Sequence, residues 1–167
     1  MLRSVVFLVH VLSIVAPRFQ PRQDAAVLMS RMGESLDLDP LTVVAYVEGE
    51  SQWQVSAINE ASGTRGLGQI QPQNFQACQT EGKECDAVRQ ALVDWNFNLT
   101  TLFHYFANNR AFCKEKEHTA LAIYWLQVVK GYDAVRRTRC GHFHGMALRI
   151  PKGVKHLMAR RHQLEKL

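Results

Sequence analysis

The chain has 167 residues, 47% of them hydrophobic and 21% charged, with four cysteines and a formal net charge of +5. This length fits one domain with tails and is enough to bury a core. The sequence has no internal repeat, no low-complexity segment and no GxGxxG or Walker-type phosphate loop, so neither a repeat protein nor a loop-type nucleotide-binding site is indicated.

The first 22 residues have the pattern of an export segment. Arg3 is followed by an apolar run from Val5 to Ala16, which is as long as the apolar part of a secretory signal and short for a membrane span. We therefore expect residues 1–22 to be an export signal or an uncleaved membrane anchor, which predicts a periplasmic or cell-envelope protein. Ile14 and Pro17 make a poor cleavage site, and a buried N-terminal helix is the alternative.

Two helices are expected next, over residues 23–36 and 41–50. Asp39 and Pro40 suit the N-cap and the first position of the second helix. Val43 and Val47 share a helix face with Glu50, and we expect this face to point to the core.

Glu50 is the candidate general acid. It ends an apolar helix, where desolvation and the partial negative charge of the helix terminus both raise the pKa expected for its carboxyl group. A carboxylic acid of this kind can donate a proton near neutral pH. Glu48 is expected to face solvent on the other side of the helix. The alternative is that Glu50 is an ordinary surface residue at a helix end.

Residues 52–72 are expected to be irregular, with short extended pieces and a glycine cluster that lets backbone approach a ligand. Cys78 and Cys85 flank a short polar turn and can be bridged, and Cys113 and Cys140 could form a second bridge. Three pairings are possible, and disulfides would fit an oxidising compartment. Four free thiols are the alternative. The sequence around Cys140 and the two following histidines offers too few ligands for a zinc site, so no metal is expected.

Three further helices are expected, over residues 86–108, 118–130 and 151–166, and the fold class is mainly α. From Lys130 to Leu167, ten Lys or Arg residues face two acids, a net +8. This basic tail is either a solvated helix face or a surface for an anionic partner such as a wall polymer or a membrane. No nucleic acid is expected, because no binding motif accompanies the charge.

Glu50-Ser51 followed by GLGQIQP at Gly66–Pro72 resembles the lytic transglycosylases of the soluble-lytic-transglycosylase type, which are lysozyme-like. Asn98 and Tyr105 match a third block of that family and Tyr124 matches a fourth. The chain departs from the family at three positions: Gly68 replaces a Met, Leu102 replaces a Gly and Trp125 replaces an Asn. The resemblance covers about residues 25–135.

The resemblance implies a lysozyme-like helical domain with a substrate cleft over residues 23–140, followed by a helical basic tail over 141–167. It makes Glu50 the sole acid and base. Supporting or substrate-binding roles are implied for Ser51, Gly66, Gln69, Ile70, Tyr124 and Trp125. Ser51 would help hold Glu50, Gln69 would line the sugar cleft, Tyr124 would hydrogen-bond Glu50, and Trp125 could stack on a sugar ring.

The activity implied is cleavage of the MurNAc-GlcNAc β-1,4 bond of peptidoglycan with formation of 1,6-anhydro-MurNAc, without cofactor or metal. Compact members of the family often open the wall locally for secretion or conjugation machines or for phage particles. The protein is therefore expected to be exported, membrane-tethered or virion-associated. Two alternatives remain: a hydrolytic lysozyme or phage endolysin on the same fold, and an inactive glycan-binding assembly component.

Overall fold

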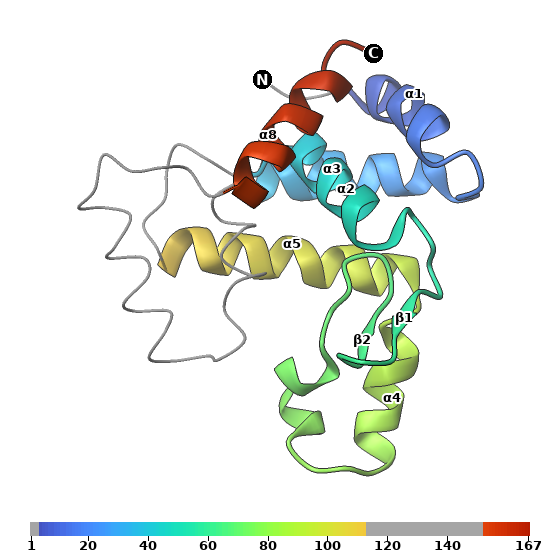
Figure 1. Cartoon of the computed structure of the whole chain (residues 1–167), viewed down its shortest axis with the longest axis vertical. Coiled ribbons are helices and arrows are strands. Elements are labelled where there is room, and N and C mark those ends of the chain that lie inside the picture. Colours follow the sequence, from blue (N-terminus) through green and yellow to red (C-terminus); the bar gives the residue numbers. More distant parts are fainter. Residues whose placement is uncertain (1–3, 113–151) are drawn as a thin grey trace.

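The computed structural model describes residues 4–112 and 152–167, and this part of the chain is mainly helical, as predicted (Figure 1). Its elements are the helices α1 (Val5–Val15), α2 (Arg22–Ser35), α3 (Pro40–Ser51), α4 (Lys83–Ala91), α5 (Trp95–Phe112) and α8 (Lys152–Leu164), the antiparallel hairpin β1 (Ile58–Asn59) and β2 (Thr64–Arg65), and the 3-10 turns η1 (Pro72–Asn74) and η2 (Gln76–Cys78). In Figure 1, α5 crosses the middle of the molecule. Helices α1, α2, α3 and α8 gather on one side of it, and the hairpin and α4 lie on the other.

The apolar N-terminal segment is a helix of the core in this structure. Ser4 caps α1 by accepting a hydrogen bond from the backbone N–H of Phe7 at 3.2 Å, and α1 packs against α2 with Leu8, Val11 and Leu12 fully buried. Arg22 donates to the carbonyl oxygen of Pro17 at 2.7 Å, just beyond the end of α1. No helix within the described ranges is long and apolar enough to cross a membrane. This is the arrangement expected of a buried N-terminal helix, and export of the chain stays a prediction.

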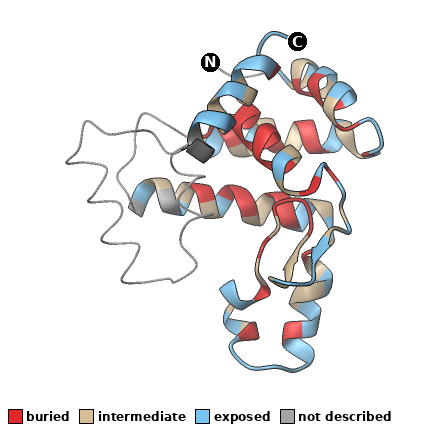
Figure 2. Cartoon of the chain, viewed as in Figure 1, coloured by how far each residue is buried: buried red, intermediate tan, exposed pale blue. Residues whose placement is uncertain are grey.

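Helix α3 lies at the centre of the packing, and its predicted start is confirmed. Asp39 is the N-cap, its Oδ1 accepts from the backbone N–H of Leu41 at 3.3 Å, and Pro40 takes the first helical position. The residues from Pro40 to Val47 are all buried (Figure 2). A helix that is apolar on all sides needs partners on all sides, and α1, α2 and α8 supply them.

The prediction of one long helix over residues 86–108 is wrong in one respect, because the structure has two helices there, α4 and α5. The break falls at residues 92–94. The backbone N–H of Phe97 donates to Asp94 Oδ1 at 2.8 Å, so Asp94 satisfies an N–H group of the first turn of α5. The apolar spacing runs in phase across the break, which is why periodicity alone predicts one helix.

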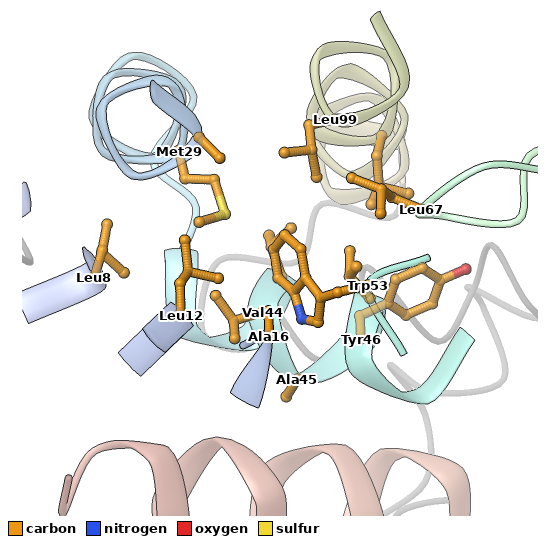
Figure 3. Close-up of a cluster of buried hydrophobic side chains, with 14 of the residues drawn as sticks. Leu8, Leu12, Ala16, Met29, Val44, Ala45, Tyr46, Trp53, Leu67 and Leu99 are labelled. Atoms are coloured by element: carbon orange, nitrogen blue, oxygen red, sulfur yellow. The ribbon is translucent and has the colours of Figure 1, made fainter. Parts of the chain in front are cut away.

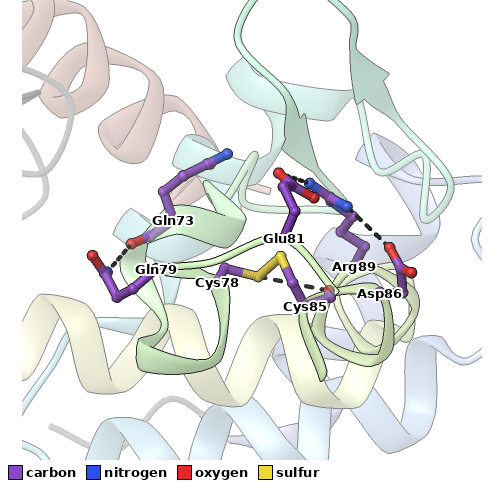
Figure 4. Close-up of a disulfide and its surroundings, with 7 residues drawn as sticks. All are labelled: Gln73, Cys78, Gln79, Glu81, Cys85, Asp86 and Arg89. Atoms are coloured by element: carbon purple, nitrogen blue, oxygen red, sulfur yellow. Dashed lines mark hydrogen bonds and ion pairs between the residues drawn. A yellow bond between two sulfur atoms is a disulfide. The ribbon is translucent and has the colours of Figure 1, made fainter. Parts of the chain in front are cut away.

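Cys78 and Cys85, whose bridge was one of the pairings left open by the sequence, form a disulfide that joins η2 to α4 (Figure 4). The loop that it closes is further held by Arg89, which pairs with Glu81 at 2.7 Å and with Asp86 at 3.0 Å. Cys113 and Cys140 lie outside the described residues.

Helix α8 is packed along α3 and is part of the same hydrophobic core. Leu164 is fully buried in that core. Arg160 makes two hydrogen bonds to the carboxylate of Glu48, at 2.7 and 2.6 Å, and Arg161 donates to Asp39 Oδ2 at 2.8 Å. The two arginines thus hold α3 near both of its ends.

Replacing Leu12 by Ala is expected to lower the free energy of unfolding by about 2–5 kcal/mol, because it leaves a cavity where the side chain is fully buried. The control is Val6→Ala on the same helix, where the side chain is 79% exposed and a change of less than about 0.5 kcal/mol is expected. Denaturant unfolding of the full chain measures both. Equal, small effects would place α1 outside the core.

Candidate functional site

Glu50 lies in the last turn of α3 and is half-buried. The helix face that carries it is core-directed as predicted, because Val43 and Val47 are fully buried. The chain then turns sharply through Gln52 and Trp53, which both have left-handed backbone conformations with φ of 51° and 62°. Such conformations cost non-glycine residues on the order of 1–3 kcal/mol each, and they cluster at functional sites.

Trp53 holds this strained turn in place. Its side chain is 4% exposed, and its ring lies 5.2 Å from the ring of Phe19. Figure 3 shows Trp53 inside the buried cluster, between Ala16 and Val44 on one side and Leu67 and Leu99 on the other. Packing of the indole therefore fixes where α3 ends, and with it the position of Glu50.

The glycine-rich segment forms a compact loop closed on itself. Arg65 and Ile70 exchange two backbone hydrogen bonds of 3.0 Å across it. The Gln69 side chain lies within the loop, accepting from Thr64 Oγ1 at 2.8 Å and donating to the carbonyl oxygens of Ala57 at 3.2 Å and Gly66 at 3.0 Å. Gln69 itself has φ of 47°, a third left-handed residue at the site.

Asn98 anchors this loop to α5. The residue is fully buried, and its Oδ1 accepts from the backbone N–H of Gly68 at 2.8 Å. Its Nδ2 donates to the carbonyl oxygens of Arg65 at 3.1 Å and Leu92 at 2.7 Å. Only a glycine fits at Gly66, since a Cβ there would collide with Leu92 O and with the Asn98 amide. One side chain therefore ties together the loop, the α4–α5 turn and α5.

Tyr46 connects α3 to the same loop. Its hydroxyl donates to the carbonyl oxygen of Gly68 at 3.4 Å, and its ring packs edge-on against Phe106 of α5 at 5.1 Å. Tyr46 precedes Glu50 by four residues, so the two side chains lie on one face of α3, one turn apart. The face that carries Glu50 is therefore the face that meets the loop.

The expectation that Glu48 faces solvent is wrong. Its side chain is only 25% exposed and pairs with Arg160. The hydrogen bond that Glu48 accepts raises the pKa of the Arg160 guanidinium above its ordinary value, although partial burial acts the other way. Helix α8 supplies this partner from 112 residues away in sequence, which is why the pattern of α3 alone could not indicate it.

The structure brings five of the predicted site residues into one region. Beside Glu50, Ser51 is buried and donates to the Val47 carbonyl oxygen of its own helix at 3.2 Å. Gly66, Gln69 and Ile70 build the loop, with Gly66 and Ile70 buried. Contact of any of them with a substrate stays a prediction. Tyr124 and Trp125 lie outside the described residues, as do the two histidines that follow Cys140.

Sequence reasoning missed the role of Tyr46. Its spacing of four residues from Glu50 was the available signal.

Within residues 4–112 and 152–167, no three His, Cys, Asp or Glu side chains lie together in a way that could hold a metal ion.

Comparisons of the chain with protein families, with curated proteins and with solved structures found no match.

Replacing Asn98 by Ala is expected to lower the free energy of unfolding by about 2–3 kcal/mol or more, because it leaves Gly68 N–H and the Leu92 carbonyl oxygen without their partner and removes one of two donors from the Arg65 carbonyl oxygen. The matched control is Asn96→Ala on the same helix, where the side chain is exposed and a change within about 0.5 kcal/mol is expected. Thermal or denaturant unfolding compares them. A loss at position 98 no larger than at position 96 would contradict the anchoring role.

Proposed function

We propose that the protein is a peptidoglycan lytic transglycosylase, with Glu50 as its only acid and base. It cleaves the β-1,4 bond between MurNAc and GlcNAc and leaves 1,6-anhydro-MurNAc, opening the wall locally. The fold proposed with it is lysozyme-like, with the glycan bound beside the Gly66–Ile70 loop. No cofactor takes part. The residues of this proposal come from the sequence resemblance, and the geometry of the described residues supports their grouping.

The observation that carries the proposal is the meeting of three separate segments. The resemblance selects Glu50-Ser51, Gly66–Pro72 and Asn98 from sequence alone. In the structure Asn98 binds Gly68, and Gly68 accepts from Tyr46, one helical turn before Glu50. A chance likeness of short motifs gives no reason for the segments to be joined by hydrogen bonds.

Two departures from the family pattern also support it, because they touch each other. Gly68 stands where the family has a larger residue, and Leu102 stands where the family has Gly. A Cβ at Gly68 would lie 2.9 Å from both methyl carbons of Leu102. Here the small residue, Gly68, is on the loop and the large one, Leu102, is on α5. The family pattern has the large residue, a Met, on the loop and the small one, a Gly, on the helix, so the two replacements compensate in volume.

A mechanism with one carboxyl group is consistent with the charges around Glu50. Glycosidases that use water flank the bond with two carboxyl groups. The Glu48 carboxylate is held by Arg160, and Glu60 lies exposed in the hairpin turn. As the proton donor of this proposal, Glu50 has to carry a proton before the reaction begins.

The proposed reaction has two steps. Glu50 first donates its proton to the glycosidic oxygen as the bond to C1 breaks, and the N-acetyl carbonyl oxygen of MurNAc attacks C1. The Glu50 carboxylate then takes the proton of the 6-hydroxyl group, whose oxygen attacks C1 and displaces the N-acetyl oxygen. Glu50 ends protonated, the N-acetyl group is restored and no water is consumed.

Glu50→Gln is expected to reduce the release of anhydro-muropeptides from purified sacculi by at least about 100-fold, since general acid–base catalysis contributes factors of about 10²–10⁴. Glu60→Gln is the control, because it removes an exposed carboxylate from the neighbouring turn and should leave the rate unchanged. Mass spectrometry of the products measures both. Reducing ends in place of anhydro ends would indicate a hydrolytic lysozyme. Binding of sacculi with no release by the unmodified protein would indicate a glycan-binding component.

The pairing of Gly68 with Leu102 predicts strong coupling between two substitutions. Gly68→Met alone overpacks the contact, and Leu102→Gly alone leaves a cavity and a helical glycine, so each should destabilise by about 2 kcal/mol or more. The double variant should be more stable than the sum of the two losses predicts, by at least about 1 kcal/mol. Denaturant unfolding of the four proteins measures this. If the two losses of stability are simply additive, the contact between Gly68 and Leu102 no longer supports the resemblance.

A further inference from the structure

Arg65 is a half-buried cation that has no partner among the described residues. Its Nε is buried and has no hydrogen-bond acceptor, and within residues 4–112 and 152–167 no hydrogen bond or ion pair involves its guanidinium. The other half-buried arginines of these ranges all have acceptors: Arg22, Arg89, Arg110, Arg160 and Arg161. A buried N–H group without an acceptor costs about 1–3 kcal/mol, and more on a charged group. Within residues 4–112 and 152–167 no fold contact therefore accounts for the half-buried charge of Arg65.

The backbone of Arg65 is held rigidly. It pairs with Ile58 across the hairpin and exchanges two hydrogen bonds with Ile70, and its carbonyl oxygen accepts from Asn98. This loop is the one that meets α3 through Tyr46 and Gly68. The backbone of Arg65 thus belongs to a fixed element that contacts α3, the helix that carries Glu50.

We propose that Arg65 binds a carboxylate of the peptidoglycan strand. A guanidinium presents its donors in a planar fork that matches a carboxylate, and the part of the half-buried Arg65 side chain that is accessible would offer such donors to a ligand. Peptidoglycan offers two sources of this group: the stem peptides, and the lactyl group of muramic acid where the peptide has been removed. The inference rests on the proposed function and specifies what distinguishes this substrate from an uncharged glycan.

The test measures binding in the Glu50→Gln background, where the substrate is not turned over. Three ligands are compared: intact glycan strands with peptides, strands stripped of peptides by an amidase, and chitin oligosaccharides, which have no carboxylate. Adding Arg65→Met should weaken binding to one or both muramic-acid ligands by about 10-fold or more, as expected for a charge-assisted pair, and should change chitin binding less than two-fold. The ligand that loses affinity identifies the carboxylate.

Two further variants separate recognition from other effects. Arg89→Met removes the same charge from α4 and should leave all three affinities unchanged. Arg65→Lys keeps the charge without the fork and should recover only part of the affinity. The melting temperature of Arg65→Met should equal or exceed that of the unmodified protein, because the group removed has no partner in the fold. A lower melting temperature would assign Arg65 a structural role and overturn the proposal.

Three results would overturn the proposal for Arg65. They are an equal loss of affinity for all three ligands in Arg65→Met, no loss of affinity for any of them, and no binding of any ligand before Arg65 is replaced. The proposed function fails separately, if the unmodified protein releases no Glu50-dependent products from sacculi. Release that depends on Glu50, together with unchanged affinities in Arg65→Met, would leave the enzyme in place and remove only the carboxylate site.

Discussion

The arrangement of the candidate site depends on one buried side-chain amide. The Asn98 side chain bonds through its oxygen and both of its N–H groups to backbone atoms at the end of β2, in the loop that follows it and in the turn between α4 and α5. Loops of this kind cannot be buried unless their polar backbone groups find partners. The amide supplies those partners, which allows the Gly66–Ile70 loop to pack closely on α5 and to meet α3 through Gly68. Glu50, Arg65 and the loop are mutually positioned because this amide is satisfied.

Two kinds of constraint then fix Glu50. Backbone strain is concentrated at Gln52, Trp53 and Gln69, next to the acid and in the loop, and the buried indole of Trp53 holds the turn. An ion pair acts on the other side of α3, where Arg160 of α8 binds the Glu48 carboxylate. Glu48 near the end of the helix is thus tied to α8, while Glu50 lies half-buried in the last turn, on the helix face that also carries Tyr46.

Local chemistry was readable from the sequence, and distant contacts were not. The start of α3 followed from Asp39-Pro40, because an N-cap and a first-turn proline act on their own neighbours in the chain. The short polar turn allowed a Cys78–Cys85 bridge, but the sequence did not choose among the possible pairings. The break between α4 and α5 was missed since the apolar spacing continues through it. Asn98 was singled out by the resemblance, but its bonds to Leu92 and Gly68 are tertiary contacts. The partner of Glu48 lies 112 residues away, on a helix whose basic residues suggested only a charged tail.

The packing of α8 on α3 has a consequence for how the chain is made. A ribosome releases residues in order, and N-terminal parts of a protein generally begin to fold first. Helix α3 emerges before Arg160 and Arg161 can pair with Glu48 and Asp39, and before α8 can cover part of its apolar surface. Both are completed only when residues near 160 have left the exit tunnel. The helix that carries Glu50 therefore reaches its final packing only after α8 has been synthesised.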